Sequence, residues 1–281
     1  MASDCFEMSR PYESSRSDCC RMLNDAEGDD QTSSPTVPAA ASDDLPPELD
    51  SDDMDAVLEV LRGTVGDAVG GLESPSRGQS YPGKSVPAFG AVGLRRFVQI
   101  CDAGDYWVCA TNVFSQCLHD VFVYDSLCST LTHSLVVQIS SLLRAEDVPQ
   151  SINFHLRFFE QRPCARLCGY YAVAACISCV LHVDPTGYFY DETQLLLFFE
   201  DLVRNGNVRL FPAVRLPVVG SWVVERRAKL HCLCQRPEDV SPEMIQCSRC
   251  LYWFHLDVCV ARPSASPAAI EKMDWLGPCC A

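Results

Sequence analysis

The sequence predicts an α+β domain followed by a small zinc-stabilised module, and three observations lead to that fold class. Helical and strand patterns follow one another over residues 48–212 in an order typical of a mostly antiparallel sheet packed against helices. A run of sixteen residues without a charged side chain begins at Cys168, which indicates a helix buried at the centre of the domain. Pairs of cysteines and one histidine follow residue 229 at spacings typical of metal ligands.

The acidic charge of the 281-residue chain is concentrated at its start. Residues 1–53 hold fourteen Asp and Glu against three Arg, and so carry eleven of the fifteen net negative charges. Residues 1–47 are rich in Ser, Asp, Pro and Ala, and we expect them to form a disordered acidic tail. The overall charge argues against a broad nucleic-acid-binding face, and no apolar run is long enough to span a membrane.

The cysteine content indicates a reducing compartment. Eighteen cysteines are many, but the N-terminus lacks the basic start and apolar segment of a secretory signal. We therefore expect reduced thiols in the cytoplasm or nucleus, some of them metal ligands rather than disulfides.

The elements of the larger domain can be predicted in order. The first is a helix capped by Ser51, whose apolar residues recur at i, i+3, i+4 and i+7 until Gly63 ends it. Short β-branched and aromatic runs then predict strands, and a period of three to four residues predicts helices. The predicted strands are 97–101, 106–111, 120–126 and 153–161, and the predicted helices are 134–144, the one beginning at Cys168, and 192–203.

Cys168 is the residue of greatest chemical interest in this domain. At a helix N-terminus, unpaired backbone N–H groups and the helix dipole would favour a thiolate, although a plain core cysteine is the commoner case. Two other residues have the right chemistry for a cysteine-nucleophile site. Asp125 follows a strand and could orient a base, and Gln161 could donate its amide to an oxyanion.

These residues resemble, in their order, the ubiquitin-like-protein-specific (SUMO-type) cysteine proteases, which have a papain-like, adenain-like fold. The resemblance is greatest to the transposon-associated members. Over residues 48–212, the runs DYWVCAT, VFVYDSL and LCGYYAVAA follow the family order of His-Trp, Asp, Gln and Cys-Gly. The resemblance implies Cys168 as nucleophile, Gln161 as oxyanion donor, Asp125 as orienting acid and Trp107 as the packing residue after the base.

The base of that arrangement is replaced, because Tyr106 stands where the family has His. A tyrosine, whose pKa is near about 10, is protonated at pH 7 and cannot replace an imidazole. His119 and His155 are the candidate substitutes, although neither stands at the family position, and Leu167 replaces the usual Asp before the nucleophile. An inactive binding module is therefore favoured, and an active peptidase on ubiquitin-like conjugates is the alternative.

Residues 229–281 form the second module, which a segment expected at 213–228 connects to the first. A module of this size has too little core to fold without metal. Zinc takes four ligands, so eight candidates make two sites. The candidates are Cys232, Cys234, Cys247, Cys250, His255, Cys259, Cys279 and Cys280.

The run HCLCQRPEDVSPEMIQCSRCLYWFHLDVCV resembles the plant homeodomain (PHD) finger, in which two zinc ions are bound in an interleaved cross-brace. The resemblance implies one zinc on Cys232, Cys234, His255 and Cys259, and the other on Cys247, Cys250 and the pair Cys279 and Cys280. Gly277 stands where the family has a ligand, with Cys279 displaced next to Cys280. The second zinc is therefore expected to be weak or to use water.

The PHD resemblance also implies a nuclear protein that reads histone H3 tails, in some members through an aromatic cage around methyl-lysine. Trp253 and Met244 stand at cage-like positions, and His231 stands where an aromatic residue is frequent, although Trp253 could equally be structural. A chromatin reader whose larger domain is only a scaffold is thus a third hypothesis. The expected partners are a ubiquitin-like protein, a histone tail or both.

Overall fold

The structure, a computed structural model, describes residues 46–77, 95–104, 106–127, 131–143, 151–157, 159, 165–216, 224–229, 244–256, 274–277 and 280. The described residues all belong to the unit Leu45–Ala281, and nearly all of the predicted acidic tail lies outside them. None of the described helices combines the length and hydropathy needed to cross a bilayer.

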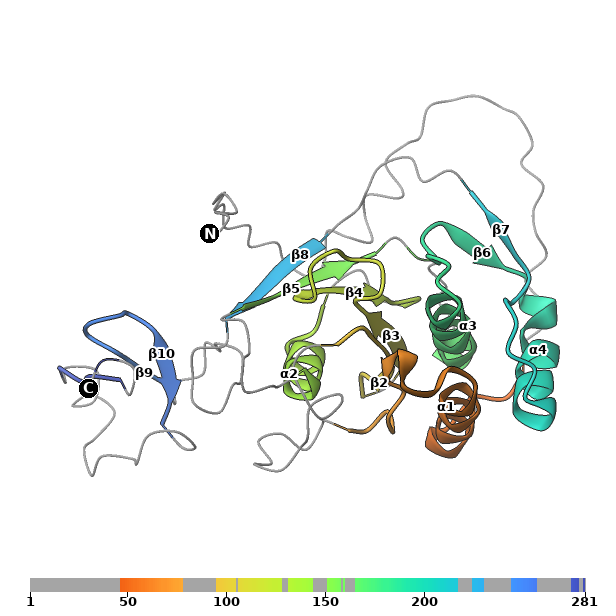
Figure 1. The fold of residues 1–281 in the computed structure, drawn as a ribbon, viewed down its shortest axis with the longest axis horizontal. Coiled ribbons are helices and arrows are strands. Elements are labelled where there is room, and N and C mark those ends of the chain that lie inside the picture. Colours follow the sequence, from red (N-terminus) through yellow and green to blue (C-terminus); the bar gives the residue numbers. More distant parts are fainter. Residues whose placement is uncertain are drawn as a thin grey trace. The chain divides into compact units, whose positions relative to one another are not determined.

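The larger domain is built on a mixed sheet that has six strands within the described residues, in the order β1-β2-β3-β4-β5-β8 (Figure 1). β1 runs parallel to β2 and β4 parallel to β5, whereas the other neighbours are antiparallel. The strands are β1 (Gly70–Gly71), β2 (Phe97–Asp102), β3 (Trp107–Thr111), β4 (Asp120–Tyr124), β5 (Ser151–Leu156) and β8 (Val224–Lys229).

Helices cover both faces of this sheet. Along β3, Trp107 and Cys109 share a core with the central helix α3, whereas Val108 and Ala110 share one with α2 on the opposite face. Two further helices, α1 and α4, pack against α3. The helices are α1 (Ser51–Val65), α2 (His133–Leu142), α3 (Cys168–Val180) and α4 (Glu192–Asn205), with 3-10 turns at Gly66–Ala68 and Ala165–Leu167 and a small sheet of β6 (Tyr188–Tyr190) and β7 (Ala213–Arg215).

All residues of α3 are buried, because the sheet and two helices enclose it. A helix that is apolar on every side is stable only in such a central position. The prediction of a buried central helix beginning at Cys168 is therefore confirmed, as is the α+β class with a mostly antiparallel sheet.

Both predicted ends of the first helix are wrong by a few residues. The N-cap is Asp50 rather than Ser51, because the Asp50 carboxylate accepts the N–H groups of Asp52 and Asp53. The helix continues through Gly63, where a mid-helix glycine costs only about 1 kcal/mol, and ends at Val65, followed by the cap residue Gly66, whose φ is +57°.

Strand β8 covers the last five residues of the segment expected to connect the two domains and the first residue expected in the second module. It pairs antiparallel with β5 along six residues, from Leu156–Val224 to Ser151–Lys229. Its sequence, VERRAK, is mostly charged, as suits a strand at the edge of a sheet, and so lacks the apolar alternation that would predict it. Residues 224–229 thus belong to the sheet of the larger domain.

The described part of the second module is a hairpin with a small core. β9 (Met244–Gln246) and β10 (Trp253–His255) are antiparallel, with Phe254 opposite Ile245. Phe254 packs edge to face on Trp275, with 5.3 Å between the ring centroids. We call residues 244–256, 274–277 and 280 the metal module.

Candidate functional site

Cys168 is the first residue of α3, and the fold brings it to the start of β3. Its side chain is 1% exposed. The backbone N–H groups of Trp107 and of the following Gly169 donate to its sulfur. Cys168, at the start of α3, thus lies next to Trp107, at the start of the central strand β3.

Burial raises the pKa of the Cys168 thiol above its ordinary value. The N–H groups of Trp107 and Gly169 lower the pKa, and the negative charges of Glu48 and Asp125 raise it further. The net shift is upward, so Cys168 is a protonated thiol at pH 7. The N–H of Gly169 at the helix N-terminus does favour the thiolate, but desolvation by burial outweighs this effect.

Asp125 lies at the same end of the central strands as Cys168, where β3 begins and β4 ends. The register Cys109–Tyr124 between β3 and β4 places the residues before β3 beside those after β4. Asp125 directly follows β4, is 2% exposed, and accepts the N–H of Leu127 at 2.8 Å. Its charge is close enough to affect the ionisation of Cys168. The structure thus brings Cys168, Trp107 and Asp125 together.

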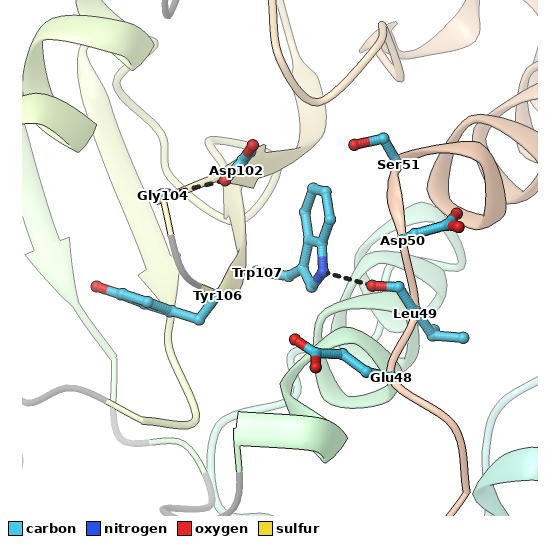
Figure 2. A pocket seen from close by; sticks show the side chains of 8 residues that line it. All are labelled: Glu48, Leu49, Asp50, Ser51, Asp102, Gly104, Tyr106 and Trp107. Carbon is cyan, nitrogen blue, oxygen red and sulfur yellow. Dashed lines mark hydrogen bonds between the residues drawn. The ribbon is translucent and has the colours of Figure 1, made fainter.

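Tyr106 stands directly before β3, and its half-buried ring packs against apolar residues of both cores. Figure 2 shows the rings of Tyr106 and Trp107 extending in different directions from the start of the strand. The indole N–H of Trp107 donates to the carbonyl of Leu49 at 3.1 Å. This hydrogen bond holds the segment before α1 against the start of β3, next to the start of α3.

The tight packing of this segment explains the glycine after the nucleophile position. A Cβ on Gly169 would lie 2.8 Å from Cε of Met54 and 3.0 Å from Cβ of Leu49. Only glycine allows α1 and its leading residues to approach α3 so closely. The Cys-Gly pair in the sequence was the one signal for this contact, and it did not reveal Leu49 as the partner.

A pocket of about 430 Å³ opens beside Trp107 (Figure 2). Three carboxylates line it, those of Glu48, Asp50 and Asp102. Two of them already accept hydrogen bonds from nearby backbone N–H groups. Asp50 caps α1, and Asp102 accepts the N–H of Gly104 at 2.8 Å. The remaining lining residues are Leu49, Ser51, Gly104, Tyr106 and Trp107.

The two candidate substitute bases lie at the far end of β4 from Asp125. His155 Nε2 is 3.7 Å from Oδ1 of Asp120, the first residue of β4, and the His119 carbonyl accepts the N–H of Asn153 beside it. Asp125 follows Asp120 by five residues, a span of roughly 16 Å in a strand. Neither imidazole is placed to take a proton from Cys168.

The other described imidazoles are also held elsewhere. His182 follows the C-terminal end of α3, roughly 20 Å from Cys168 by helix rise. His133 begins α2, on the opposite face of the sheet, with its Nδ1 3.3 Å from Nη2 of Arg226. His255 belongs to the metal module. Gln161, the expected oxyanion donor, lies outside the described residues.

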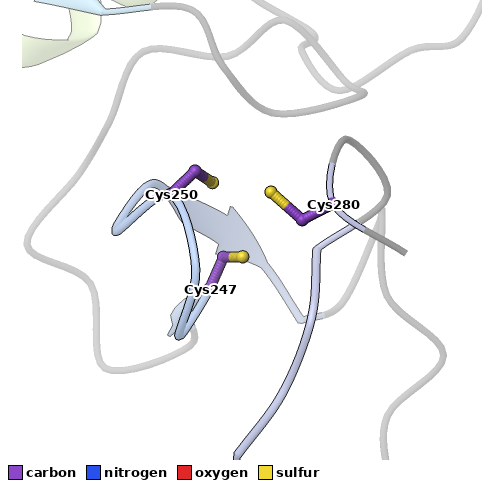
Figure 3. Close-up of side chains that lie close together, drawn as sticks. All are labelled: Cys247, Cys250 and Cys280. Atoms are coloured by element: carbon purple, nitrogen blue, oxygen red, sulfur yellow. The ribbon is translucent and has the colours of Figure 1, made fainter.

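The second candidate site is a cluster of three cysteines in the metal module. The sulfurs of Cys247, Cys250 and Cys280 lie within 4.8 Å of one another (Figure 3). A tetrahedral zinc with Zn–S bonds of about 2.3 Å separates its sulfurs by roughly 3.8 Å, so the three residues fit this ion. Thiolates are also the ligands that such soft metals prefer.

Backbone N–H groups stabilise the negative charge of the Cys247 thiolate, which a bound metal ion would neutralise. The N–H of Cys250 is the main cause that lowers the pKa of Cys247 to about 6, with further donors at Gly277 and Arg249. The Gly277 N–H lies 3.2 Å from the sulfur. Cys247 is therefore mostly a thiolate at pH 7, the form that binds zinc.

The remaining predicted residues of the module are only partly described. His255 is buried in β10, directly opposite Met244, and does not belong to the three-sulfur cluster. Met244 is 7% exposed and Trp253 is 38% exposed, so only Trp253 has a substantial accessible surface. The other predicted residues lie outside the described part of the chain, namely Cys232, Cys234, Cys259, Cys279 and His231.

Comparison with known proteins finds similarity in structure alone. The sequence matches no protein-family model and no curated protein. The structure is similar to the SUMO protease Ulp1 with its catalytic cysteine oxidised to a sulfenic acid, at 11% identity and a TM-score of 0.38, over 58% of this chain and 80% of that one. It is also similar to the C-terminal Ulp1 protease domain in complex with Smt3, the yeast ortholog of SUMO, at 11% identity and a TM-score of 0.39, over 58% of this chain and 79% of that one. Similarity of this degree does not define a family for the chain.

Proposed function

We propose that the larger domain is a cysteine-protease-like domain of the ubiquitin-like-protein-specific type that works as a binding module rather than as a peptidase. One observation carries the proposal. Cys168 lies beside Trp107 and within electrostatic range of Asp125, but the residue before Trp107 is Tyr106, and the described imidazoles lie elsewhere. Among the described residues, the arrangement thus retains a nucleophile and an acid but brings no imidazole to them.

Such a site is poor at covalent catalysis. A buried thiol whose pKa is raised supplies little thiolate at pH 7, and Tyr106 cannot accept its proton. Loss of one triad member costs roughly three to six orders of magnitude in rate. We propose a ubiquitin-like protein as the binding partner of this domain.

For the second module we propose zinc binding, with the three-sulfur cluster as the supporting observation. Reading of a histone tail in the nucleus is the second candidate function. The observation that favours it is the accessible indole of Trp253 on β10. Titration of the full chain with methylated and unmodified H3 peptides tests it, and Trp253→Ala is expected to weaken any binding at least tenfold.

The test of the first proposal uses ubiquitin-like proteins that carry a thiol-reactive group at the C-terminus. The natural chain is expected to bind such a protein reversibly without covalent capture. Tyr106→His is expected to gain capture, and Tyr106→Phe, which has the same ring without a base, is not. Covalent capture of the natural chain, abolished by Cys168→Ala, would overturn the proposal.

A further inference from the structure

We infer that the outer edge of strand β7 binds an extended, acidic segment of a partner protein, which joins the sheet of β6 and β7 as a further strand. These two strands form a small sheet of their own (Figure 1). The inference goes beyond the function proposed above and does not depend on it, because no residue of β7 belongs to the Cys168 site or to the metal module.

Two hydrogen bonds at the ends of this strand pair show which residues of β7 face β6. The N–H of Asp191 donates to the carbonyl of Pro212 at 2.9 Å, and the N–H of Leu216 donates to the carbonyl of Gly187 at 3.0 Å. Opposite residues of an antiparallel pair alternate between hydrogen-bonded and non-hydrogen-bonded positions. Val214, midway between Pro212 and Leu216, therefore also directs its backbone groups to β6.

The residues that alternate with these, Ala213 and Arg215, direct their N–H and C=O groups away from β6. Both residues are exposed. Within the described parts of the chain, β7 pairs with β6 alone, so the outward backbone groups have no hydrogen-bond partner there. Unpaired donors and acceptors along a strand edge are the groups that an extended segment uses when it joins a sheet.

The side chains at this edge form an apolar surface on one side of the strand. Val214 is 65% exposed, and Leu216, the residue after β7, is 46% exposed. Both point to the same side, because side chains alternate along a strand. The edge strand β8 of the larger sheet differs, since most of its residues are charged, which discourages pairing with another chain. The edge of β7 lacks this protection on its apolar side.

Arg215 determines the charge of the segment that fits this edge. Its guanidinium carbon lies 5.8 Å from the ring centroid of Tyr188, the residue opposite, and it makes no ion pair with the described residues. Arg209, by contrast, is paired with Asp201 at 2.7 Å. Residues 206–216 include two arginines and no acidic residue. An Asp or Glu opposite Arg215 on the added strand would therefore form a favourable cross-strand pair.

The partner is thus an extended segment that combines acidic with β-branched residues. Its backbone would bond to Ala213 and Arg215, its apolar side chains would contact Val214, and its carboxylates would pair with the Arg215 guanidinium. A second copy of β7 fits less well, because it would bring a second Arg215 to the same short sheet and place like charges close together.

Titration of the full chain with a short peptide that alternates valine and glutamate tests the inference. The peptide is expected to bind and to protect the N–H groups of Ala213 and Arg215 from hydrogen exchange, whereas that of Val214 is protected with or without it. Two control peptides are expected to bind at least about fivefold more weakly. One has lysine in place of glutamate, and the other has N-methylated amides and so lacks N–H donors.

The lysine peptide is a stringent control, because the chain carries a net charge of −15 and general electrostatic attraction would favour it. A preference for glutamate therefore reports the local charge of Arg215. Binding of the lysine peptide that equals or exceeds that of the glutamate peptide would overturn the inference, as would failure of the glutamate peptide to bind.

Matched variants locate the binding edge. Arg215→Glu is expected to lower the affinity for the valine–glutamate peptide at least about fivefold, because the cross-strand charge pair becomes repulsive. Arg62→Glu, the same change of charge at an exposed arginine of α1, is expected to leave it unchanged. Equal effects of the two substitutions would overturn the inference.

Ala213→Pro removes one outward N–H and leaves the hydrogen bonds between β7 and β6 in place, as an edge strand allows. It is expected to lower the affinity by a similar factor. Protection of the Val214 N–H in each variant checks that the strand pair stays folded. Self-association of the natural chain that Ala213→Pro abolishes would show that a second copy occupies the edge, and would overturn the inference.

Discussion

Cys168 and Cys247 are both buried and both accept backbone N–H groups, yet the pKa of one thiol is raised and that of the other is lowered to about 6. Cys168 lies in the main core, where burial and the charges of Glu48 and Asp125 outweigh two N–H donors. Cys247 lies in a thin module with three N–H donors around its sulfur. Thiol acidity thus depends on the balance of donors, charges and desolvation, and a place at a helix N-terminus is not sufficient.

The comparison separates two uses of cysteine in one chain. The metal module presents a thiolate that needs no base, as zinc binding requires. The larger domain presents a neutral thiol that would need a base to react, and Tyr106 cannot act as one. Four experiments test this contrast.

The largest effect is expected from Cys247→Ser. Loss of a thiolate should release the zinc of this cluster and unfold the metal module, since zinc supplies roughly 10–16 kcal/mol to small structural sites. The larger domain has separate cores and should stay folded. Elemental analysis and limited proteolysis measure both effects, with Cys117→Ser, at an exposed cysteine, as the control. Unchanged zinc content would contradict the assignment.

Acidification should release the same zinc. The pKa of Cys247 is lowered from its ordinary value of 9.0 to about 6, so its stabilising contribution is complete above pH 9 and is lost as the pH falls through about 6. Zinc retained after dialysis at a series of pH values measures this. Retention that begins to fall already near pH 8 would show that the N–H donors do not stabilise the thiolate.

The next effect concerns the glycine beside Cys168. Gly169→Ala should destabilise the larger domain by about 1–3 kcal/mol, because its Cβ would overlap Met54 and Leu49. Gly63→Ala is the matched control, since nothing lies within 4 Å of its added carbon and a mid-helix alanine should stabilise by about 0.5–1 kcal/mol. Urea unfolding curves compare the two. Equal midpoints would mean that α1 does not pack on Gly169 as described.

The smallest effect is on thiol reactivity. With the pKa of Cys168 raised and its side chain buried, its alkylation by iodoacetamide at pH 7 should be at least about tenfold slower than that of the exposed Cys117. Peptide mapping by mass spectrometry gives both rates in one sample. Preferential labelling of Cys168 would indicate an activated thiolate and would revive the peptidase hypothesis.

Much of the fold could be predicted because it depends on local pattern. The short β-branched and aromatic runs of β2, β3 and β4, and the uncharged run of α3, led to the correct element types and order. β8 could not be predicted in this way, because its charged residues are stabilised by pairing with β5, far away in the sequence. The ends of α1 differed because the choice between Asp50 and Ser51 as cap depends on the local path of the chain.

The residues with a chemical role could be identified from sequence alone. They are Cys168 at the start of a buried helix, Tyr106 where a base is expected, and cysteine pairs at metal-ligand spacing. Such inferences need only the spacing of residues within one segment, because the period of a helix or strand and the spacing of paired metal ligands are both local features of the chain. The ionisation of each thiol, the close contact at Gly169 and the hydrogen bond from Gly277 to Cys247 depend on the tertiary structure. The atoms responsible, from Glu48 and Trp107 around Cys168 and from Phe254 and Gly277 around Cys247, come together only when distant segments pack.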